Sequence, residues 1–500
     1  MNPASAPARA AGDVAALDLR SRPRDRLIIA AAAVVALALV LFGRSSAPVF
    51  LALLGMVALV TAVAALRWPL GTLVVASLAT LADPVLLPAI LPRGFDPSPI
   101  GLSEPMLLAA GLVIAVSATR RRAAAAAFRD PVPVLAALFV AAATASAVIN
   151  RVPPAVAVLG IVVTVDAIAA FVAARMLRVS AGRAGWAVGA VVGVVLIAAV
   201  VGIAQHVVDP QIFGLVPFIG QFGEGVRIGS FLGNPNMLAS VIGLALPFAL
   251  FTSARGDRLR WPARVALFVL VLALLLTYSR GGWLAVGIGL IVGALLLEWR
   301  ALPVLAVVVA LAWGTAAVLP RGGGPIDELA GPVDSTVDRF AHLGGGDDLR
   351  ARFLRDGLPI VDDHPVLGVG PGRYGGAVAA IVPSPVYDEY DTGLFGYRTV
   401  HNFWLHLLGE TGVVGTTLFL ALIAGLLIRF VRAARSASGV AFVVLAGTAT
   451  MLVVASLNSA TEMIFEGNMP SVLIWLMLGI ASCLAPGWGR RALAPDHPSP

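Results

Sequence analysis

Residues 401–415 contain the side chains best suited to acid–base chemistry. His401 and Asn402 stand where a long polar loop re-enters apolar sequence. Asn402 is a good helix N-cap, because its side-chain oxygen can accept a hydrogen bond from a first-turn N–H that has no helical partner. His401 then lies at the membrane surface, where an imidazole with an ordinary pKa of about 6.5 can exchange protons near neutral pH. We expect His401 to act as a base; the alternative is a purely structural His–Asn cap.

Glu410 lies on the same expected helix as this pair. Asn402, His406 and Glu410 recur at steps of four, a spacing that places side chains on one helical face. An ionisable residue inside a membrane helix is costly and indicates a functional site. The alternative is a buried Glu410 that a neighbouring helix holds in place.

Two arginines on short polar segments are candidates for binding an anion. Arg227 begins a turn-rich stretch in which Asn236 is the expected N-cap of the next helix. Arg280 lies in the break at 277–283, which is either a tight turn between two helices or an interruption of one long helix. A guanidinium can hold a phosphate in a bidentate contact worth about 1.5–3 kcal/mol. The alternatives are that Arg227 extends to lipid headgroups and that Arg280 pairs with a carboxylate such as Glu410.

The segment 320–400 is a long loop rich in Gly, Pro and Asp, with one helical pattern at about 347–361. This pattern fits an amphipathic helix on the membrane surface that ends at His364, with Arg352 off its apolar face. The glycine-rich turn at 367–372 follows, but its spacing is not that of a dinucleotide-binding loop.

The remaining acidic residues and histidines are expected to be structural. Asp362 and Asp363 are adjacent at a helix end, which favours solvated side chains over a metal site. His406 lacks a partner at metal-ligand spacing. Glu462 and Glu466 lie on the last outer loop and are expected to be solvated or to cap a helix; the alternative is that they line a polar cleft.

The composition excludes a soluble domain. The 500 residues are 59% hydrophobic and 13% charged, and the mean hydropathy is +0.92. We expect an all-α polytopic membrane bundle of about 12–14 transmembrane helices, with one large extracytoplasmic loop containing short helices. All 35 basic residues are arginine, which excludes a Walker A lysine and a Schiff-base lysine. Cys483 is the single cysteine, so no intrachain disulfide and no cysteine-based metal site can form.

The positions of the arginines predict the orientation of the chain. Fourteen apolar segments between residues 27 and 485 are candidate spans. With the N-terminus inside, 23 of the 35 arginines fall on inner segments, as the positive-inside rule requires, and the formal charge of +7 therefore does not indicate nucleic acid. Both termini are then cytoplasmic, and the candidate residues face the other side, where nucleotide sugars are absent. The expected substrate there is one already activated on a lipid.

Four motifs together resemble those of O-antigen ligases and related polymerases. His401-Asn402, nine residues, Gly412, two residues and Gly415 resemble the family signature. The turn at 367–372, Ser279-Arg280-Gly281, and the Arg227 loop with Asn234-Pro235-Asn236 resemble further family features, in family order. The resemblance covers about residues 220–425.

The resemblance implies a metal-independent membrane glycosyltransferase of the bacterial cytoplasmic (inner) membrane that needs no cofactor. Its donor would be a glycan on undecaprenyl diphosphate, and its acceptor a hydroxyl of a glycan or lipid, as in lipopolysaccharide or exopolysaccharide synthesis. His401 would take the acceptor proton, and Arg227 and Arg280 would clamp the diphosphate, supported by Asn402, Glu410 and Arg352. The expected division of the chain is a disordered cytoplasmic tail at 1–26, transmembrane helices at 27–219, a catalytic region at 220–428 including the loop 320–400, transmembrane helices at 429–485, and a cytoplasmic tail at 486–500.

A flippase or transporter for the same lipid-linked glycan is the alternative function. A transporter needs polar or charged residues deep within many spans. The early spans here are nearly pure Ala, Val, Leu and Ile, and the charges gather at the outer membrane surface. This distribution favours chemistry at the surface over passage through the bundle.

Overall fold

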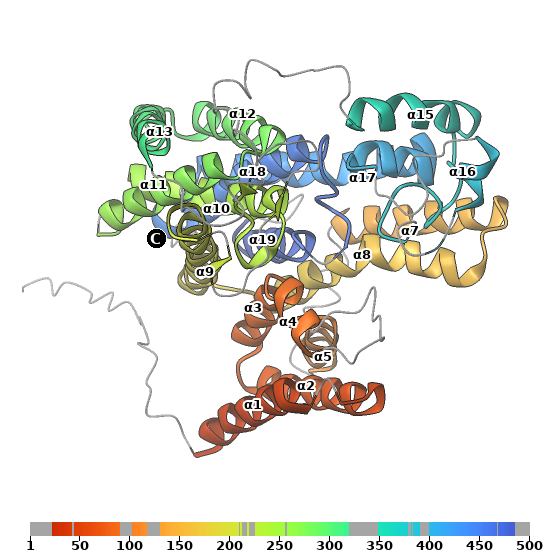
Figure 1. Ribbon diagram of the computed structural model, residues 1–500, viewed down its shortest axis with the longest axis horizontal. Helices are drawn as coiled ribbons and strands as arrows, with labels where there is room; N and C mark the ends of the chain where they lie inside the picture. The colour runs from red at the N-terminus through yellow and green to blue at the C-terminus, as the bar shows by residue number, and fades with distance from the viewer. Residues whose placement is uncertain are drawn as a thin grey trace, which may run out of the picture.

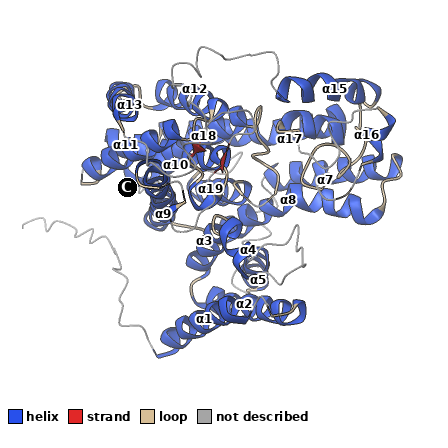
Figure 2. Cartoon of the chain, viewed as in Figure 1, coloured by secondary structure: helices blue, strands red, loops and turns tan. Residues whose placement is uncertain are grey.

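The protein is almost wholly helical within the residues that its computed structural model describes (Figure 2). Among these residues, nine helices are long and apolar enough to cross a membrane. These helices confirm the all-α polytopic class. A helix can span lipid because it satisfies its own backbone hydrogen bonds. The described residues are 23–42, 45–90, 103–117, 131–209, 211–212, 218–219, 226–255, 258–319, 349–378, 382, 384–390, 400–467 and 469–485.

The first five helices form a group at the lower edge of the molecule in Figure 1. Phe50, Leu53 and Leu54 of α2 pack against Leu39 and Ile90 of its neighbours in a small apolar cluster of their own. The link to the rest of the bundle runs through α3, which contacts α8, α9 and α19, and through α5, which contacts α8. These helices are α1 (Pro23–Phe42), α2 (Ala47–Arg67), α3 (Pro69–Ala79), α4 (Asp83–Ile90) and α5 (Ser103–Val116).

Helix α10 is the centre of the bundle. Its apolar window is 83% buried, against 22% for α13 at the periphery, as expected for a helix that is apolar on every side. It packs against α9, α11, α12, α13 and α18. The helices of this middle part are α7 (Pro131–Ile149), α8 (Pro154–Met176), α9 (Ala181–Val207), α10 (Pro235–Arg255), α11 (Arg260–Leu276), α12 (Arg280–Leu297) and α13 (Ala301–Val318).

The C-terminal helices connect the α7–α8 pair with the helices around α10. Helix α17 contacts α7 and α18, while α19 lies against α8. Short elements lie between the long helices, and α15 and α16 sit together beside α17 at one end of the molecule (Figure 1). The remaining elements are β1 (Phe218–Ile219), β2 (Val226–Arg227), a 3₁₀ helix (Ser230–Leu232), α15 (Leu349–Asp363), α16 (Pro385–Glu389), α17 (Phe403–Arg435), α18 (Gly439–Asn458) and α19 (Ser471–Leu484).

All fourteen apolar segments expected from the sequence contain a helix, but fewer than twelve reach the length of a membrane span. Helices α3, α5 and α19 have 11, 14 and 14 residues, whereas a crossing takes about 20 residues. The break at 277–283 proves to be a boundary between two helices, because α11 ends at Leu276 and α12 begins at Arg280. The tail at 1–22 and the loop section 320–348 lie outside the described residues.

Two local predictions can be compared with the structure directly. Helix α15 ends at Asp363, and the backbone N–H of His364 closes its last turn on Ile360 and Val361, which confirms the expected end. The N-cap of α10 was placed wrongly, because Asn234 and not Asn236 accepts the first-turn hydrogen bonds, from the N–H groups of Asn236 and Met237.

Candidate functional site

His401 lies two residues before the start of α17, and Asn402 between them caps that helix. The side chain of Asn402 accepts a hydrogen bond of 3.1 Å from the N–H of Leu405, which confirms the predicted cap. The His401 ring is 45% exposed, and its Nδ1 lies 3.5 Å from Oε2 of Glu462, which is 7% exposed. The expectation that Glu462 is solvated is therefore wrong. The turn after α18 folds over the start of α17, where the N–H of Phe403 donates to the carbonyl of Ser459 at 2.8 Å.

Arg227 reaches the break that precedes Arg280. Its side chain is 8% exposed, so it lies within the protein and does not extend into the lipid headgroups. Its Nε donates to the carbonyl of Thr277 at 2.9 Å, and its Nη2 donates to Oδ1 of Asn236 at 2.9 Å. Because Arg280 begins α12 just after Thr277, the segments that carry the two arginines meet at one corner of the bundle.

A chain of polar groups leads from this corner toward the turn that holds Glu462. The hydroxyl of Ser240 donates to the carbonyl of Asn236 at 2.7 Å and accepts from Nδ2 of Asn458 at 2.8 Å. The hydroxyl of Thr461 then donates to the carbonyl of Asn458 at 3.1 Å. Buried polar groups of this kind fix the relative position of the elements that they join.

The start of α12 packs closely against the same turn. A Cβ added at Gly281 would lie 2.5 Å from the hydroxyl oxygen of Thr461, so only glycine allows this approach. Thr461 is adjacent to Glu462, the partner of His401. The segments that carry Arg227, Arg280 and His401 are thus mounted along one seam, formed by α10, the start of α12 and the turn after α18.

Backbone strain gathers on the same three segments. Among the described residues, five non-glycine residues have a positive φ, and three of them are Ser230, Tyr278 and His401 (φ of 53°, 51° and 48°). Such conformations cost about 1–3 kcal/mol each and cluster at active sites and ligand clamps. Ser230 lies three residues after Arg227, Tyr278 lies two residues before Arg280, and the third strained residue is His401 itself. Each of the three segments that carry a candidate residue therefore contains one strained residue.

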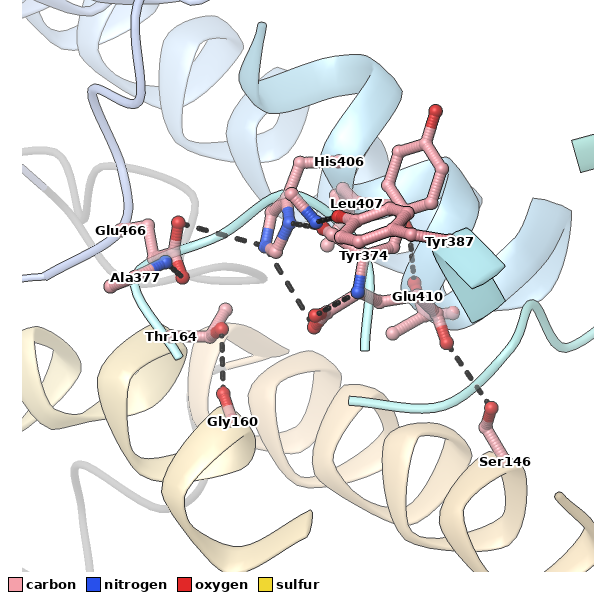
Figure 3. Close-up of polar contacts among 12 residues, drawn as sticks. Ser146, Gly160, Thr164, Tyr374, Ala377, Tyr387, His406, Leu407, Glu410 and Glu466 are labelled. Carbon is pink, nitrogen blue, oxygen red and sulfur yellow. Dashed lines mark hydrogen bonds and ion pairs between the residues drawn. The ribbon is translucent and has the colours of Figure 1, made fainter. Parts of the chain in front are cut away.

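A second histidine is buried below the seam, between two carboxylates (Figure 3). His406 is 1% exposed, and its Nε2 lies 3.8 Å from Oε2 of Glu410 and 3.7 Å from Oε2 of Glu466. Its Nδ1 lies 2.5 Å from the carbonyl oxygen of Tyr374, an arrangement in which the ring nitrogen donates. We call these three side chains the buried clamp. The expectation that Glu466 is solvated is wrong, because its side chain is 3% exposed. His406 has two carboxylate neighbours.

The buried clamp attaches the glycine-rich loop to the end of the bundle. Oε1 of Glu410 accepts from the N–H of Tyr374 at 3.2 Å, and Oε1 of Glu466 accepts from the N–H of Ala377 at 2.8 Å. Glu410 is therefore held by the loop and by His406, and not by Arg280. The i to i+4 spacing of His406 and Glu410 was visible in the sequence, but nothing there indicated that Glu466 completes the group.

Helix α17 is interrupted at Gly412, one of the signature glycines. Its φ of 61° and ψ of −166° are not helical, and the interruption leaves backbone groups without intrahelical partners. The loop supplies those partners: the N–H of Val369 donates to the carbonyl of Gly409 at 2.8 Å, that of Gly370 to Glu410 at 3.1 Å, and the N–H of Val413 donates to Pro365 at 2.9 Å. Irregular backbone of this kind is tolerated in a membrane protein only where protein covers it.

The tyrosines of this region do not supply a base. Burial raises the pKa of the Tyr374 and Tyr387 phenols well above their ordinary value, so both remain protonated near neutral pH. The hydroxyl of Tyr387 accepts a hydrogen bond from the N–H of Gly375, which is a structural contact. That His401 is the base therefore stays a prediction, and its ring is half-exposed.

The supporting role suggested for Arg352 stays a prediction, because the position of its side chain lies outside the described residues. Among the residues that are described, no group of three or more His, Cys, Asp or Glu side chains is arranged to hold a metal ion.

The fold is that of a multi-pass, mainly helical membrane protein, and the seam joins the segments that carry Arg227, Arg280 and His401. Residues 265–420 match the sequence model of a family described as O-antigen ligase. The match confirms the resemblance over this segment, which includes Arg280, His401 and Glu410 but not Arg227 or Glu462. It supports an activity of the O-antigen ligase or polymerase type in general. No curated protein matches the chain.

Proposed function

We propose that this protein transfers a glycan from undecaprenyl diphosphate to an acceptor hydroxyl at the extracytoplasmic face of the bacterial cytoplasmic membrane. The observation that supports this most is the seam, where contacts join three segments far apart in the chain that carry two arginines and a half-exposed histidine. The family match to residues 265–420 indicates the reaction class.

The proposed transfer is a single displacement. His401 takes the proton of the acceptor hydroxyl while the acceptor oxygen bonds to the anomeric carbon of the glycan. The bond between that carbon and the diphosphate oxygen breaks, and the electron pair leaves with undecaprenyl diphosphate. Base catalysis of this kind contributes about 10²–10⁴-fold.

Arg227 and Arg280 stabilise the negative charge that grows on the leaving diphosphate. Stabilisation by pre-positioned groups is usually the largest contribution to such a step. Thr277 and Asn236 hold Arg227 in position before any substrate arrives, so little side-chain entropy is lost on binding. The arginine pair takes the charge-neutralising role that a divalent cation has in other diphosphate chemistry, which is the basis for proposing a metal-independent enzyme.

The test is reconstitution of the purified protein in liposomes with a radiolabelled undecaprenyl-diphosphate glycan. A lipid acceptor and a glycan acceptor are supplied in separate reactions, which distinguishes a ligase from a polymerase. We expect the wild type to consume the donor and release undecaprenyl diphosphate, and His401→Ala to remain inserted but to transfer about 10²–10⁴-fold more slowly. Movement of the labelled lipid across the bilayer without glycan transfer would establish the transporter instead.

A further inference from the structure

We propose that Glu462 is a positioning residue for His401, whose ring it orients through Nδ1 so that Nε2 carries the lone pair that faces the acceptor hydroxyl. This inference rests on the proposed function, in which His401 is the base. Glu462 lies outside the segment that matches the family model.

The contact joins a half-exposed ring to an enclosed carboxylate. Oε2 of Glu462 is 3.5 Å from Nδ1 of His401, and the exposed fractions of the two side chains are 7% and 45%. The backbone N–H of Glu462 donates to the carbonyl of Asn458 at 3.0 Å, and the preceding Thr461 packs against Gly281. The carboxylate is therefore fixed by its own turn, while the ring remains accessible to a substrate.

The chemistry of the two groups then determines the tautomer. An ionised carboxylate only accepts hydrogen bonds, and a neutral imidazole has one donating and one accepting nitrogen. With Nδ1 facing Glu462, the proton of the neutral ring stays on Nδ1, and Nε2 is left as the acceptor. A base that a third group orients in this way is the arrangement found in many nucleophile–base–carboxylate sites.

The same two segments contain a second histidine–glutamate pair, which provides a structural comparison. His406 and Glu466 also join the start of α17 to the turn after α18, but their exposed fractions are 1% and 3%. That pair is sealed beneath the loop and can only hold the fold together. The exposed ring distinguishes the His401–Glu462 pair and gives it access to a reacting group.

The kinetic test compares Glu462→Gln, Glu462→Asp, His401→Ala and the double variant His401→Ala/Glu462→Gln in the reconstituted transfer assay. At metal sites, loss of the group that orients a ligating histidine costs about 10–100-fold, and we take the same factor for the group that orients His401. We expect Glu462→Gln to lower kcat by this factor. The donor KM should change less than about twofold, because the substitution acts on the chemical step and not on donor binding. Glu462→Asp should recover part of the rate. The double variant should be no slower than His401→Ala, since Glu462 acts through the histidine.

The control is Glu389→Gln, which removes an exposed carboxylate on α16. If Glu462→Gln turns over at the wild-type rate while His401→Ala is slowed about 10²–10⁴-fold as expected, the inference is overturned and the proposed function stands. Equal slowing of the wild type and of His401→Ala by the Glu462 change also overturns it, because the two residues would then act independently.

A measurement without substrate separates this inference from the proposed function. ¹⁵N-histidine NMR of the protein in lipid bilayers reports which ring nitrogen carries the proton, and His401→Ala assigns the signal. We expect the Nδ1-protonated form in the wild type and a shift toward the Nε2-protonated form in Glu462→Gln. A His401 signal that Glu462→Gln leaves unchanged would overturn the inference even if glycan transfer were never observed.

Discussion

Arg227 donates a hydrogen bond of 2.9 Å from its Nε to the carbonyl oxygen of Thr277. The contact connects a residue outside the family-matched segment 265–420 to the break that begins α12. In the proposed function Arg227 acts on the same ligand as Arg280, although one residue ends β2 and the other begins α12. The geometry of the guanidinium matters here as much as its charge, because separate nitrogens contact Thr277 and Asn236.

The first prediction concerns the arginine fork. Arg227→Lys keeps the charge but cannot contact Thr277 and Asn236 while also facing an anion. Loss of a charge-assisted contact costs about 1.5–3 kcal/mol, so kcat/KM for the lipid-linked donor should fall about 10- to 150-fold. Arg355→Lys, at a side chain that is 72% exposed, is the matched control and should keep wild-type kinetics. Equal behaviour of the two variants would remove Arg227 from the site.

The second prediction concerns the cap that places His401. Asn402→Ala removes the hydrogen bond to Leu405 and should destabilise the protein by about 1 kcal/mol. The start of α17 then frays. The initial transfer rate should fall clearly, while the protein remains folded and its melting temperature falls only slightly. Asn402→Asp retains a capping oxygen and should preserve both properties. Thermal unfolding and initial rates measured on the same preparations check this, and an active Asn402→Ala variant would argue against it.

The third prediction compares two glycines that both have a positive φ. Gly412 and Gly439 have φ of 61° and 57°, values that L side chains rarely adopt, and the ψ of −166° at Gly412 lies in a region that is essentially confined to glycine. Only at Gly412 would the new methyl group also collide with the backbone of Val366 and Leu367; at Gly439 it meets open space. Gly412→Ala should therefore be clearly less stable than Gly439→Ala, as judged by melting temperature. Equal destabilisation would mean that the loop does not pack against the break.

The fourth prediction concerns the buried clamp. Glu466→Ala leaves His406 beside Glu410 alone and removes the acceptor for the N–H of Ala377. Breaking a buried pair by removing one partner costs about 3–5 kcal/mol. Hydrogen exchange of the loop backbone around Ala377 should accelerate strongly, while α10 should keep its protection. If the loop exchanges at the wild-type rate, the clamp does not hold it.

The fifth prediction concerns divalent cations. If the arginines alone compensate the diphosphate charge, EDTA removes no group that contacts the transition state. The transfer rate should then stay within about twofold of the untreated rate. The same treatment of Arg280→Lys should also have no further effect. A rate that collapses in chelator and recovers with Mg²⁺ would show that the guanidinium groups are insufficient.

Sequence reasoning worked where the determinants are local. The cap at Asn402 and the end of α15 before His364 depend on residues within one helical turn, so spacing alone identifies them. The same reasoning failed at Asn236, because two asparagines flank Pro235 and only the backbone geometry decides which one caps α10. Apolar segments indicated every long helix but not how much of each helix crosses the membrane.

The contacts that complete the site join distant segments and leave no periodic signal. Glu462 and Glu466 resemble solvated loop residues in the sequence, because nothing local indicates that their turn folds over the start of α17. The spacing of His406 and Glu410 was visible in the sequence, but the contact with Glu466 was not. Only the three-dimensional path of the turn after α18 reveals that Glu462 lies beside His401 and Glu466 beside His406.

The interruption of α17 at Gly412 also limits how the protein can move. The stretch 365–370 supplies hydrogen bonds to backbone groups at the interruption, and each bare peptide group exposed to hydrocarbon costs several kcal/mol. Swinging this stretch outward would leave several such groups without partners at once. The stretch 365–370 is therefore expected to keep its position against α17 when other parts of the protein move.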